Sequence, residues 1–113
     1  MAIPKSIASQ QRREAQSIIE RFNREVLGGG EVRYAARFKG LYLYLDRMDF
    51  LADEWAPICR LRFTGAATAW EFAIYKYSRA IYDPDETWFP GHEKFDGSIE
   101  SALCAGLAAY PPG

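Results

Sequence analysis

Tyrosine and arginine side chains recur at alternate positions through the middle of this 113-residue chain. Alternate residues of an extended strand point to the same face of a sheet. One sheet face is therefore expected to gather Arg33, Arg37, Tyr42, Tyr44, Arg60, Arg62, Glu71, Tyr75 and Tyr77. Three roles fit such a face: an ordinary exposed sheet, a protein interface, or a surface for single-stranded nucleic acid. The net charge of −1 and the lack of a nucleic-acid signature sequence place a protein interface ahead of nucleic acid.

A second candidate group surrounds His92, the only histidine. Five carboxylates stand near it in the sequence, at Asp83, Asp85, Glu86, Glu93 and Asp96. Carboxylates with a histidine can bind a metal ion or act in acid–base catalysis. However, their spacing does not complete a calcium loop, and Asp-Pro-Asp is ordinary turn chemistry. No metal or other cofactor is predicted, and a metal-assisted enzyme around His92 is kept only as a lesser alternative.

The two cysteines do not indicate a catalytic site. Cys59 falls on the predicted inward side of a strand, where a free cysteine usually acts as a small core hydrophobe. Cys104 falls on or beside the apolar stripe of the last helix, and nothing local pairs either thiol with His92. The sequence also lacks dinucleotide, phosphate-loop, serine-hydrolase and zinc motifs. A non-enzymatic protein is therefore expected.

Length and composition predict one globular domain over residues 1–113. The chain is 49% hydrophobic and 26% charged, which is ordinary for a folded domain. Residues 31–47 and 57–79 carry eight basic against three acidic residues, whereas residues 80–113 carry one against six. No apolar run is long enough to span a membrane, and no secretory signal is visible. A cytoplasmic protein without membrane contacts is expected.

The two ends of the chain read as helices. Residues 7–27 have apolar side chains at helical spacing, with Ser6 or Ser9 as a possible cap and three glycines at 28–30 as the stop. Residues 98–109 form the second helix, with Ser98 as its cap and Glu100 in its first turn.

Residues 31–47 alternate in polarity, but the alternation changes register at Lys39-Gly40. A hairpin turn there would place Phe38 opposite Leu41 and Arg37 opposite Tyr42. A bulge at Gly40 would instead keep one long strand with its apolar side inward. Both alternatives remain open, with the hairpin slightly preferred, and both give the same inward and outward residues.

The remaining segments complete an antiparallel meander within residues 31–82. Residues 48–56 read as a loop, Pro57 as the start of a strand, and residues 69–79 as the central strand. Residues 83–97 read as an ordered loop, because they contain two prolines and two glycines. The expected fold is α+β: three to four antiparallel strands with both helices packed on one face. The buried face would hold Val32, Tyr34, Phe38, Leu41, Leu43, Leu45, Cys59, Leu61, Phe63, Trp70, Phe72 and Ile74. Lys76 also falls on this side, so it must lie near a strand end to reach water.

Three runs, residues 37–47, 59–65 and 70–78, resemble a small family of uncharacterised prokaryotic proteins. The likeness extends through Phe89-Pro90-Gly91 and the final helix, and covers about residues 31–110. It implies that these runs form one unit, and it carries over no catalytic residue. The element order also resembles the double-stranded-RNA-binding fold, which binds through basic residues at the start of its second helix. Here that place holds Ser98-Ile99-Glu100-Ser101, which is acidic and argues against that activity.

The sequence therefore predicts a small interaction module. It would bind a protein partner, or a second copy of itself, through the open sheet face or a sheet edge. Single-stranded nucleic acid on the same face is the alternative.

Overall fold

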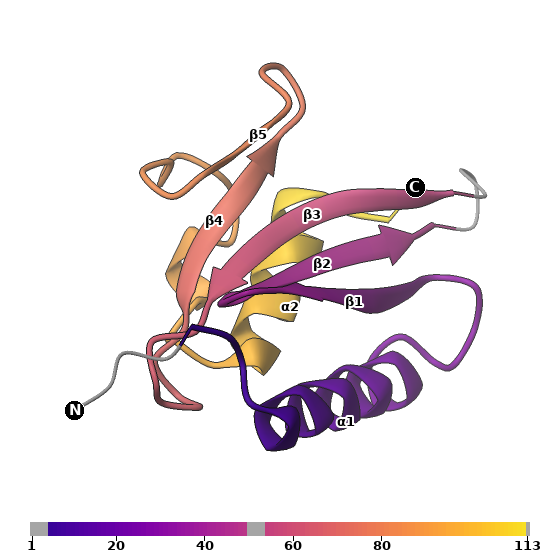
Figure 1. Ribbon diagram of the computed structural model, residues 1–113. Helices are drawn as coiled ribbons and strands as arrows, with labels where there is room; N and C mark the ends of the chain where they lie inside the picture. The colour runs from indigo at the N-terminus through magenta and orange to yellow at the C-terminus, as the bar shows by residue number, and fades with distance from the viewer. Residues whose placement is uncertain (1–4, 50–53, 113) are drawn as a thin grey trace.

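Five strands and two α-helices make up the computed structural model, which describes residues 5–49 and 54–112. In chain order the elements are α1 (Ser9–Glu25), β1 (Arg33–Lys39), β2 (Tyr42–Met48), β3 (Trp55–Arg62), β4 (Glu71–Lys76), β5 (Ile81–Asp83), the 3₁₀ turn η1 (His92–Lys94) and α2 (Ile99–Ala109). The strands form a single antiparallel sheet in the order β1-β2-β3-β4-β5 (Figure 1). The α+β meander is confirmed.

The sheet has one strand more than the three to four predicted. After β4 the chain turns through residues 77–80 and pairs Ile81 with Lys76 to begin β5. Ala80 closes this turn with a φ of +54°, an unusual conformation for a residue with a side chain. A strand of three residues is too short to show an alternating pattern, so β5 is not predicted from the sequence.

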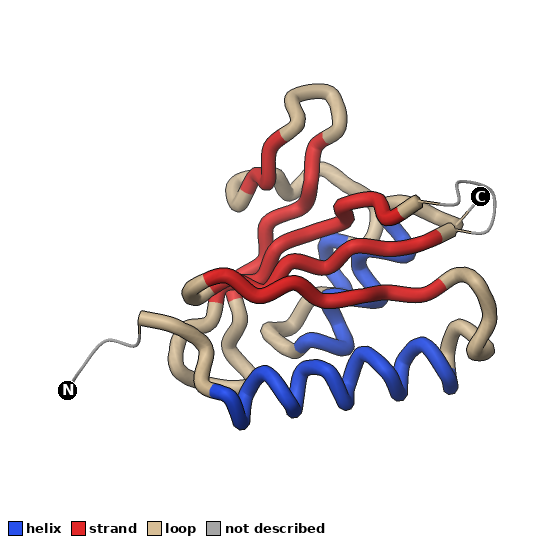
Figure 2. Tube along the Cα trace, turned by 45° about the vertical axis from the view of Figure 1, so that its right-hand side comes forward, coloured by secondary structure: helices blue, strands red, loops and turns tan. Residues whose placement is uncertain are grey.

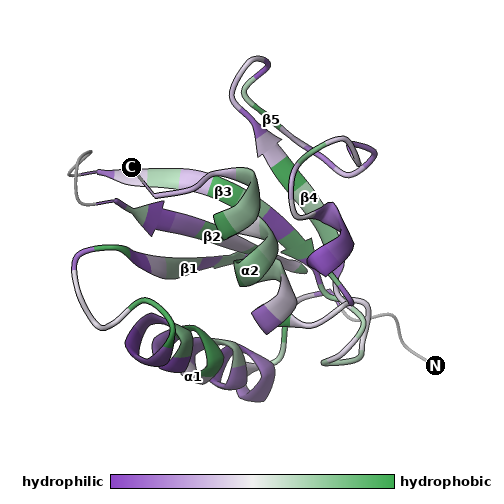
Figure 3. Cartoon of the chain, turned by 180° about the vertical axis from the view of Figure 1, so that it is seen from behind, coloured by the Kyte–Doolittle hydropathy of each residue, from purple (hydrophilic) through white to green (hydrophobic). Residues whose placement is uncertain are grey.

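Both helices lie on the same side of the sheet. Seen from behind, α2 crosses in front of the strands while α1 runs beside β1 (Figure 3). The tube in Figure 2 shows the same arrangement, with one face of the sheet left without a helix. In the described part of the chain, neither helix combines the length and apolar character needed to cross a membrane.

The helices begin and end close to the predicted places, with one difference at the start of α1. Ala8 is its N-cap and no side chain caps the helix, so the predicted capping by Ser6 or Ser9 is wrong. Ser9 is the first helical residue, and its hydroxyl instead accepts from Arg12 at 3.3 Å. At α2 the prediction is confirmed, since the Ser98 hydroxyl accepts from the backbone N–H of Ser101.

A hairpin joins β1 to β2, which settles the choice between a hairpin and a bulge at Lys39-Gly40. Gly40 and Leu41 form its two-residue loop, and Gly40 has the positive φ, +59°, that such turns require. The register differs from the predicted one by two residues, because Phe38 pairs with Leu43 and Arg37 with Tyr44. The inward and outward sets stay the same under this shift, since side chains alternate with a period of two.

A β-bulge interrupts the pairing of β2 with β3. Leu45 pairs with Cys59 and Asp46 with Pro57, so Ile58 is the extra residue. Ile58 and Cys59 are both buried. The strand starts at Trp55, two residues before the predicted start at Pro57. Proline is tolerated within this strand because the bulge removes the regular ladder bond that its missing N–H would have made.

The core lies between the sheet and the two helices, and most of the predicted inward residues line it. Fully buried among them are Tyr34, Leu43, Leu45, Cys59, Leu61, Phe63, Trp70 and Ile74. Val32, Phe38, Leu41 and Phe72 are only half-buried. Lys76 lies at the end of β4 and forms an ion pair with Glu86, so it reaches a carboxylate from the inward side as its position required.

Arg47 is the main polar residue of this core, and it was not predicted there. It follows Leu43 and Leu45 on the inner face of β2, and only 1% of its side chain is exposed. Its guanidinium donates to Asp49 at 2.8 Å and to the carbonyl oxygen of Tyr110 at the end of α2. A cation at a helix C-terminus complements the partial negative charge of the last carbonyl groups. Arg47 therefore holds α2 against the sheet.

Candidate binding face

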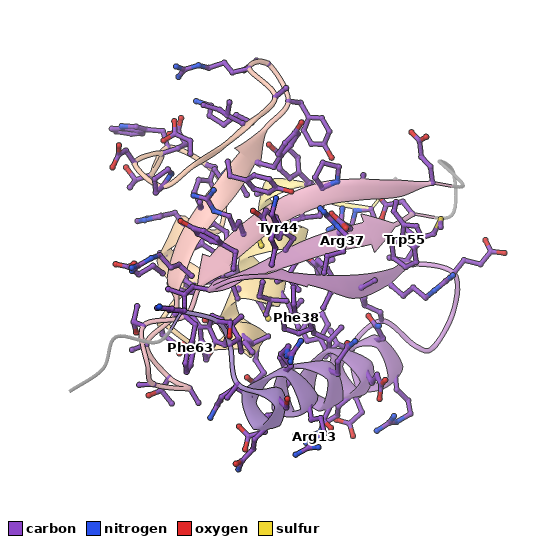
Figure 4. All side chains as sticks on the ribbon, viewed as in Figure 1. Arg13, Arg37, Phe38, Tyr44, Trp55 and Phe63 are labelled. Carbon is purple, nitrogen blue, oxygen red and sulfur yellow. The ribbon has the colours of Figure 1, made fainter. Side chains whose placement is uncertain are left out.

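The side of the sheet without helices, here called the open face, carries the predicted Tyr and Arg side chains. The strand register places on it Arg33, Ala35, Arg37, Lys39, Tyr42, Tyr44, Asp46, Trp55, Pro57, Arg60, Arg62, Glu71, Ala73, Tyr75 and Tyr82. Arg37, Tyr44 and Trp55 are labelled on this face in Figure 4. Five of these residues are basic and two are acidic, so the open face has a net charge of +3.

Arginines of the open face lie on its aromatic rings. The Arg60 guanidinium is 4.4 Å from the centroid of the Tyr42 ring and 5.5 Å from that of Tyr82. Arg37 lies 5.0 Å from the centroid of Tyr44, and Arg33 lies 5.2 Å from that of Trp55. These cation–π contacts position each guanidinium beside an aromatic ring.

The carboxylates of the open face engage only two of these arginines. Arg37 contacts Asp46 through two bonds of 2.5 and 3.1 Å, and Arg62 contacts Glu71 at 2.8 Å. The strand register pairs Asp46 with Ala35, which leaves Asp46 diagonally across from Arg37 and within reach of its guanidinium. The hydrogen bond that Arg37 donates to the Asp46 carboxylate raises the pKa of Arg37. Within the described ranges, no carboxylate lies within 4.0 Å of Arg33 or Arg60.

An apolar depression of about 530 Å³ lies in the middle of the open face. Its lining consists of Ala35, Arg37, Asp46, Trp55, Pro57, Tyr75 and Tyr82. The Tyr75 and Tyr82 rings stand edge to face, 4.9 Å apart, and form one wall. Trp55 is 43% exposed and borders the depression on the β3 side. Concave surfaces with aromatic walls and a few fixed polar groups are typical binding sites.

A second, more polar depression of about 430 Å³ lies beside the first. Tyr42, Arg60, Arg62 and Glu71 line it, together with Pro84 and Asp85 from the segment after β5. The carboxylate of Asp85 therefore borders the basic side chains within the same chain. This reduces the positive charge available to a ligand at this end of the open face.

Tyr77 was predicted on the open face and lies just beyond the end of β4. Its hydroxyl donates to the carbonyl oxygen of Pro57 at 2.6 Å, and its ring meets Tyr75 edge to face at 4.9 Å. Burial raises the pKa of Tyr77 to about 12. The ring is nevertheless 51% exposed, so it extends the aromatic surface past the depression.

The free edge of the sheet at β1 is partly occupied by α1. The side-chain amide of Asn23 donates to the carbonyl oxygen of Tyr34 at 2.9 Å and accepts from its backbone N–H at 2.8 Å. One side chain thus takes both of the groups that a further strand would use at that position. Proteins often protect sheet edges in this way against pairing with another chain.

The acidic segment around His92 does not bring its side chains together as metal ligands. Among the residues that the structure describes, no group of three or more His, Cys, Asp or Glu side chains is placed to hold an ion. His92 lies in η1, and its ring contacts Phe89 at 5.5 Å. Glu86 instead pairs with Lys76, and Asp96 accepts from Ser98. These side chains order the segment.

The predicted binding residues include two that line the depression, Arg37 and Tyr75, and omit Ala35, Asp46, Trp55, Pro57 and Tyr82. The sequence pattern predicts a loop at Trp55 and the start of a strand at Pro57. Tyr82 lies on the short β5. The one available signal was the aromatic residue at position 82, five residues after Tyr77, since a tight turn between them would pair Tyr75 with Tyr82.

Comparisons with protein-family models, curated proteins and solved structures found no significant match to this chain. The family resemblance drawn from the sequence therefore stays a prediction.

Proposed function

We propose that this protein is a small, non-enzymatic interaction module that binds a protein partner through its open face. The apolar depression walled by Tyr75, Tyr82 and Trp55 carries the proposal. Tyrosine, tryptophan and arginine are the residues most enriched among binding hot spots, and here they surround one concavity. A second copy of the chain is included among the possible partners.

The protection of β1 favours the open face over a sheet edge as the binding surface. Asn23 occupies the backbone of Tyr34 at one edge, and β5 at the other edge spans only three residues. A short strand offers few backbone groups for pairing with another chain. A cytoplasmic location also belongs to this proposal, and the two unpaired cysteines support it.

The test compares a double variant in the depression, Tyr75→Ala with Tyr82→Ala, with a control on α1, Arg12→Ala with Gln16→Ala. A partner captured by the wild-type protein should be lost with the first variant and kept with the second, and the loss should recur with the two purified proteins. Circular dichroism and melting temperature establish that both variants fold. A partner bound equally by both variants, or no partner and no self-association, would contradict the proposal.

Single-stranded nucleic acid is a second candidate, favoured by one observation. Arg33 and Arg60 each lie on an aromatic ring and contact no carboxylate within the described ranges. An arginine beside an exposed ring can neutralise a phosphate while the ring stacks on a base.

This candidate predicts binding of a labelled single-stranded oligonucleotide that weakens as salt increases. Arg33→Glu with Arg60→Glu should abolish it, whereas the same charge change on α1, Arg12→Glu with Arg13→Glu, should not. Fluorescence anisotropy at low and moderate salt measures both. Absence of binding at low salt would remove this candidate and leave the protein interface.

A further inference from the structure

Trp88 is 93% exposed, more than any other large hydrophobic side chain in the described part of the protein. Leaving an indole in water is unfavourable, because burial of a large apolar side chain shifts an equilibrium several-fold toward the state in which it is buried. Exposed tryptophans are also among the commonest hot spots of protein interfaces. The fold of a single chain therefore does not explain why the Trp88 side chain is exposed.

The loop that carries Trp88 is held in place. Glu86 forms an ion pair with Lys76 of β4 and accepts from the backbone N–H of Trp88 at 2.6 Å. Asp83 accepts from the backbone N–H of Asp85 at 3.0 Å, which fixes the preceding turn. The indole is thus displayed on an ordered loop, and little conformational entropy is lost when it docks.

The loop is acidic as well as aromatic. Residues 83–88 contain three carboxylates and no basic residue. One carboxylate, that of Glu86, is taken up by Lys76. Asp85 borders Arg60 and Arg62 of its own chain, so Asp83 is the carboxylate beside Trp88 that is left for another surface. A matching surface would offer an apolar concavity with unpaired cations at its margin.

The apolar depression on the open face has these properties. The Arg33 guanidinium lies over the ring of Trp55, which borders the depression. The Arg60 guanidinium is 5.5 Å from the centroid of the Tyr82 ring, which forms part of its wall. Neither arginine forms an ion pair among the described residues, but Asp85 of the same chain borders Arg60. Arg33, on the Trp55 side, is therefore the cation left for an incoming carboxylate. Its volume of about 530 Å³ is within the range of sites that enclose small organic groups, and so is ample for an indole.

We infer that the Trp88 loop of one copy docks into the apolar depression of a second copy, with Asp83 facing Arg33 at its margin. The inference rests on the proposed function, and names a second copy of the chain as the partner of the open face. It joins the most exposed aromatic side chain to the aromatic concavity, and an acidic loop to a basic margin. The contact is electrostatically complementary, so salt weakens it.

The test measures the mass of the full chain by light scattering or sedimentation from micromolar to about 1 mM chain concentration, a range that detects weak dimers. Wild-type protein should self-associate. Trp88→Ala should raise the dissociation constant of the dimer ~30-fold or more, as expected for a hot-spot residue. Val26→Ala, at the exposed C-cap residue of α1, is the matched control and should change nothing.

A mixing experiment identifies the two halves of the contact. The loop variant Trp88→Ala and the depression variant Tyr75→Ala with Tyr82→Ala should each be monomeric alone. Mixed together they should form a one-to-one complex, because the intact loop of the second fits the intact depression of the first. Intrinsic fluorescence of the indole should shift to shorter wavelength in that complex.

Three results would overturn the inference. One is a wild-type protein that stays monomeric, in which case partner capture by the open face still decides the proposed function. Another is self-association that Tyr75→Ala with Tyr82→Ala abolishes and Trp88→Ala leaves unchanged, which supports the open face and removes the loop. The last is a mixture of the two variants that remains monomeric while wild type associates.

Discussion

Asn23 of α1 and Tyr34 of β1 are joined by two hydrogen bonds, so that one side-chain amide satisfies both backbone groups of an edge-strand residue. The same tyrosine uses its hydroxyl to donate to the carbonyl oxygen of Leu103 in α2 at 2.8 Å. Tyr34 therefore links β1 to both helices, through its backbone on one side and its side chain on the other.

Asn23→Ala should lower the free energy of unfolding by about 1–3 kcal/mol, because it leaves a partly buried donor and acceptor without partners. Denaturation in urea measures the change, with Gln16→Ala on the exposed side of α1 as the control. The variant should also aggregate more readily, since the protected edge becomes available for pairing. A change below a few tenths of a kcal/mol would show that water replaces the amide.

Arg47→Ala should be among the most destabilising single substitutions, at about 3–5 kcal/mol. The substitution leaves the Asp49 carboxylate and the last carbonyl groups of α2 without their buried cation. Arg47→Lys should recover only part of the loss, because one ammonium group cannot reproduce the planar fork of a guanidinium. Arg21→Ala, at an exposed site on α1, serves as the control, and full recovery by lysine would refute the geometric argument.

Gly106→Ala should destabilise the protein by about 1–2 kcal/mol, even though alanine has the better helix propensity. A Cβ atom at this position would lie 2.6 Å from the Tyr34 hydroxyl oxygen and 2.7 Å from a methyl group of Ile58. Gly30→Ala is the matched control, because nothing lies within 4 Å of its Cβ position. Thermal unfolding of both variants separates close helix–sheet packing from a general effect of removing glycine.

The two thiols should differ sharply in reactivity. Cys59 is fully buried, and burial raises its pKa, whereas Cys104 is exposed on α2. A thiol reagent should therefore modify one cysteine in the native protein and the second only after unfolding. Mass spectrometry after brief labelling identifies the site, and fast labelling of Cys59 would mean that β3 opens readily.

Stability should fall between about pH 10 and pH 12. Burial raises the pKa of Tyr34 and Tyr77, the latter to about 12 from an ordinary value of 10.0. A raised pKa in the folded state means that the unfolded chain releases its proton first, so stability is complete below pH 10 and decreases above it. Tyr77→Phe should make the decrease shallower, measured as the denaturant midpoint at several pH values. An unchanged midpoint up to pH 12 would contradict the assignment.

The alternation of side chains predicted which residues face inward and outward, because this property depends only on parity. It therefore survived the two-residue error in the β1–β2 register, and it placed Arg37, Tyr44 and Arg60 correctly. It failed where parity breaks. The bulge at Ile58 turns two successive residues into the core, and no local composition distinguishes it from a regular strand.

The other features that the sequence did not predict depend on tertiary contacts. Arg47 reads as an exposed cation until α2 is known to end above it, since its acceptors lie 59 and 63 residues further along the chain. The depression on the open face likewise needs Trp55 from the start of β3 and Tyr82 from β5. Neither strand end had an alternating pattern that would identify it.

The opposite orientations of successive strand residues also have an evolutionary consequence. Residues of the proposed binding face, such as Tyr42 and Arg60, alternate with core residues, such as Leu43 and Leu61. Single substitutions can thus change the side chains of the open face without loss of core packing. The exception is the pair Pro57 and Ile58, where neighbouring positions serve both sides, and there the chain should tolerate the least variation.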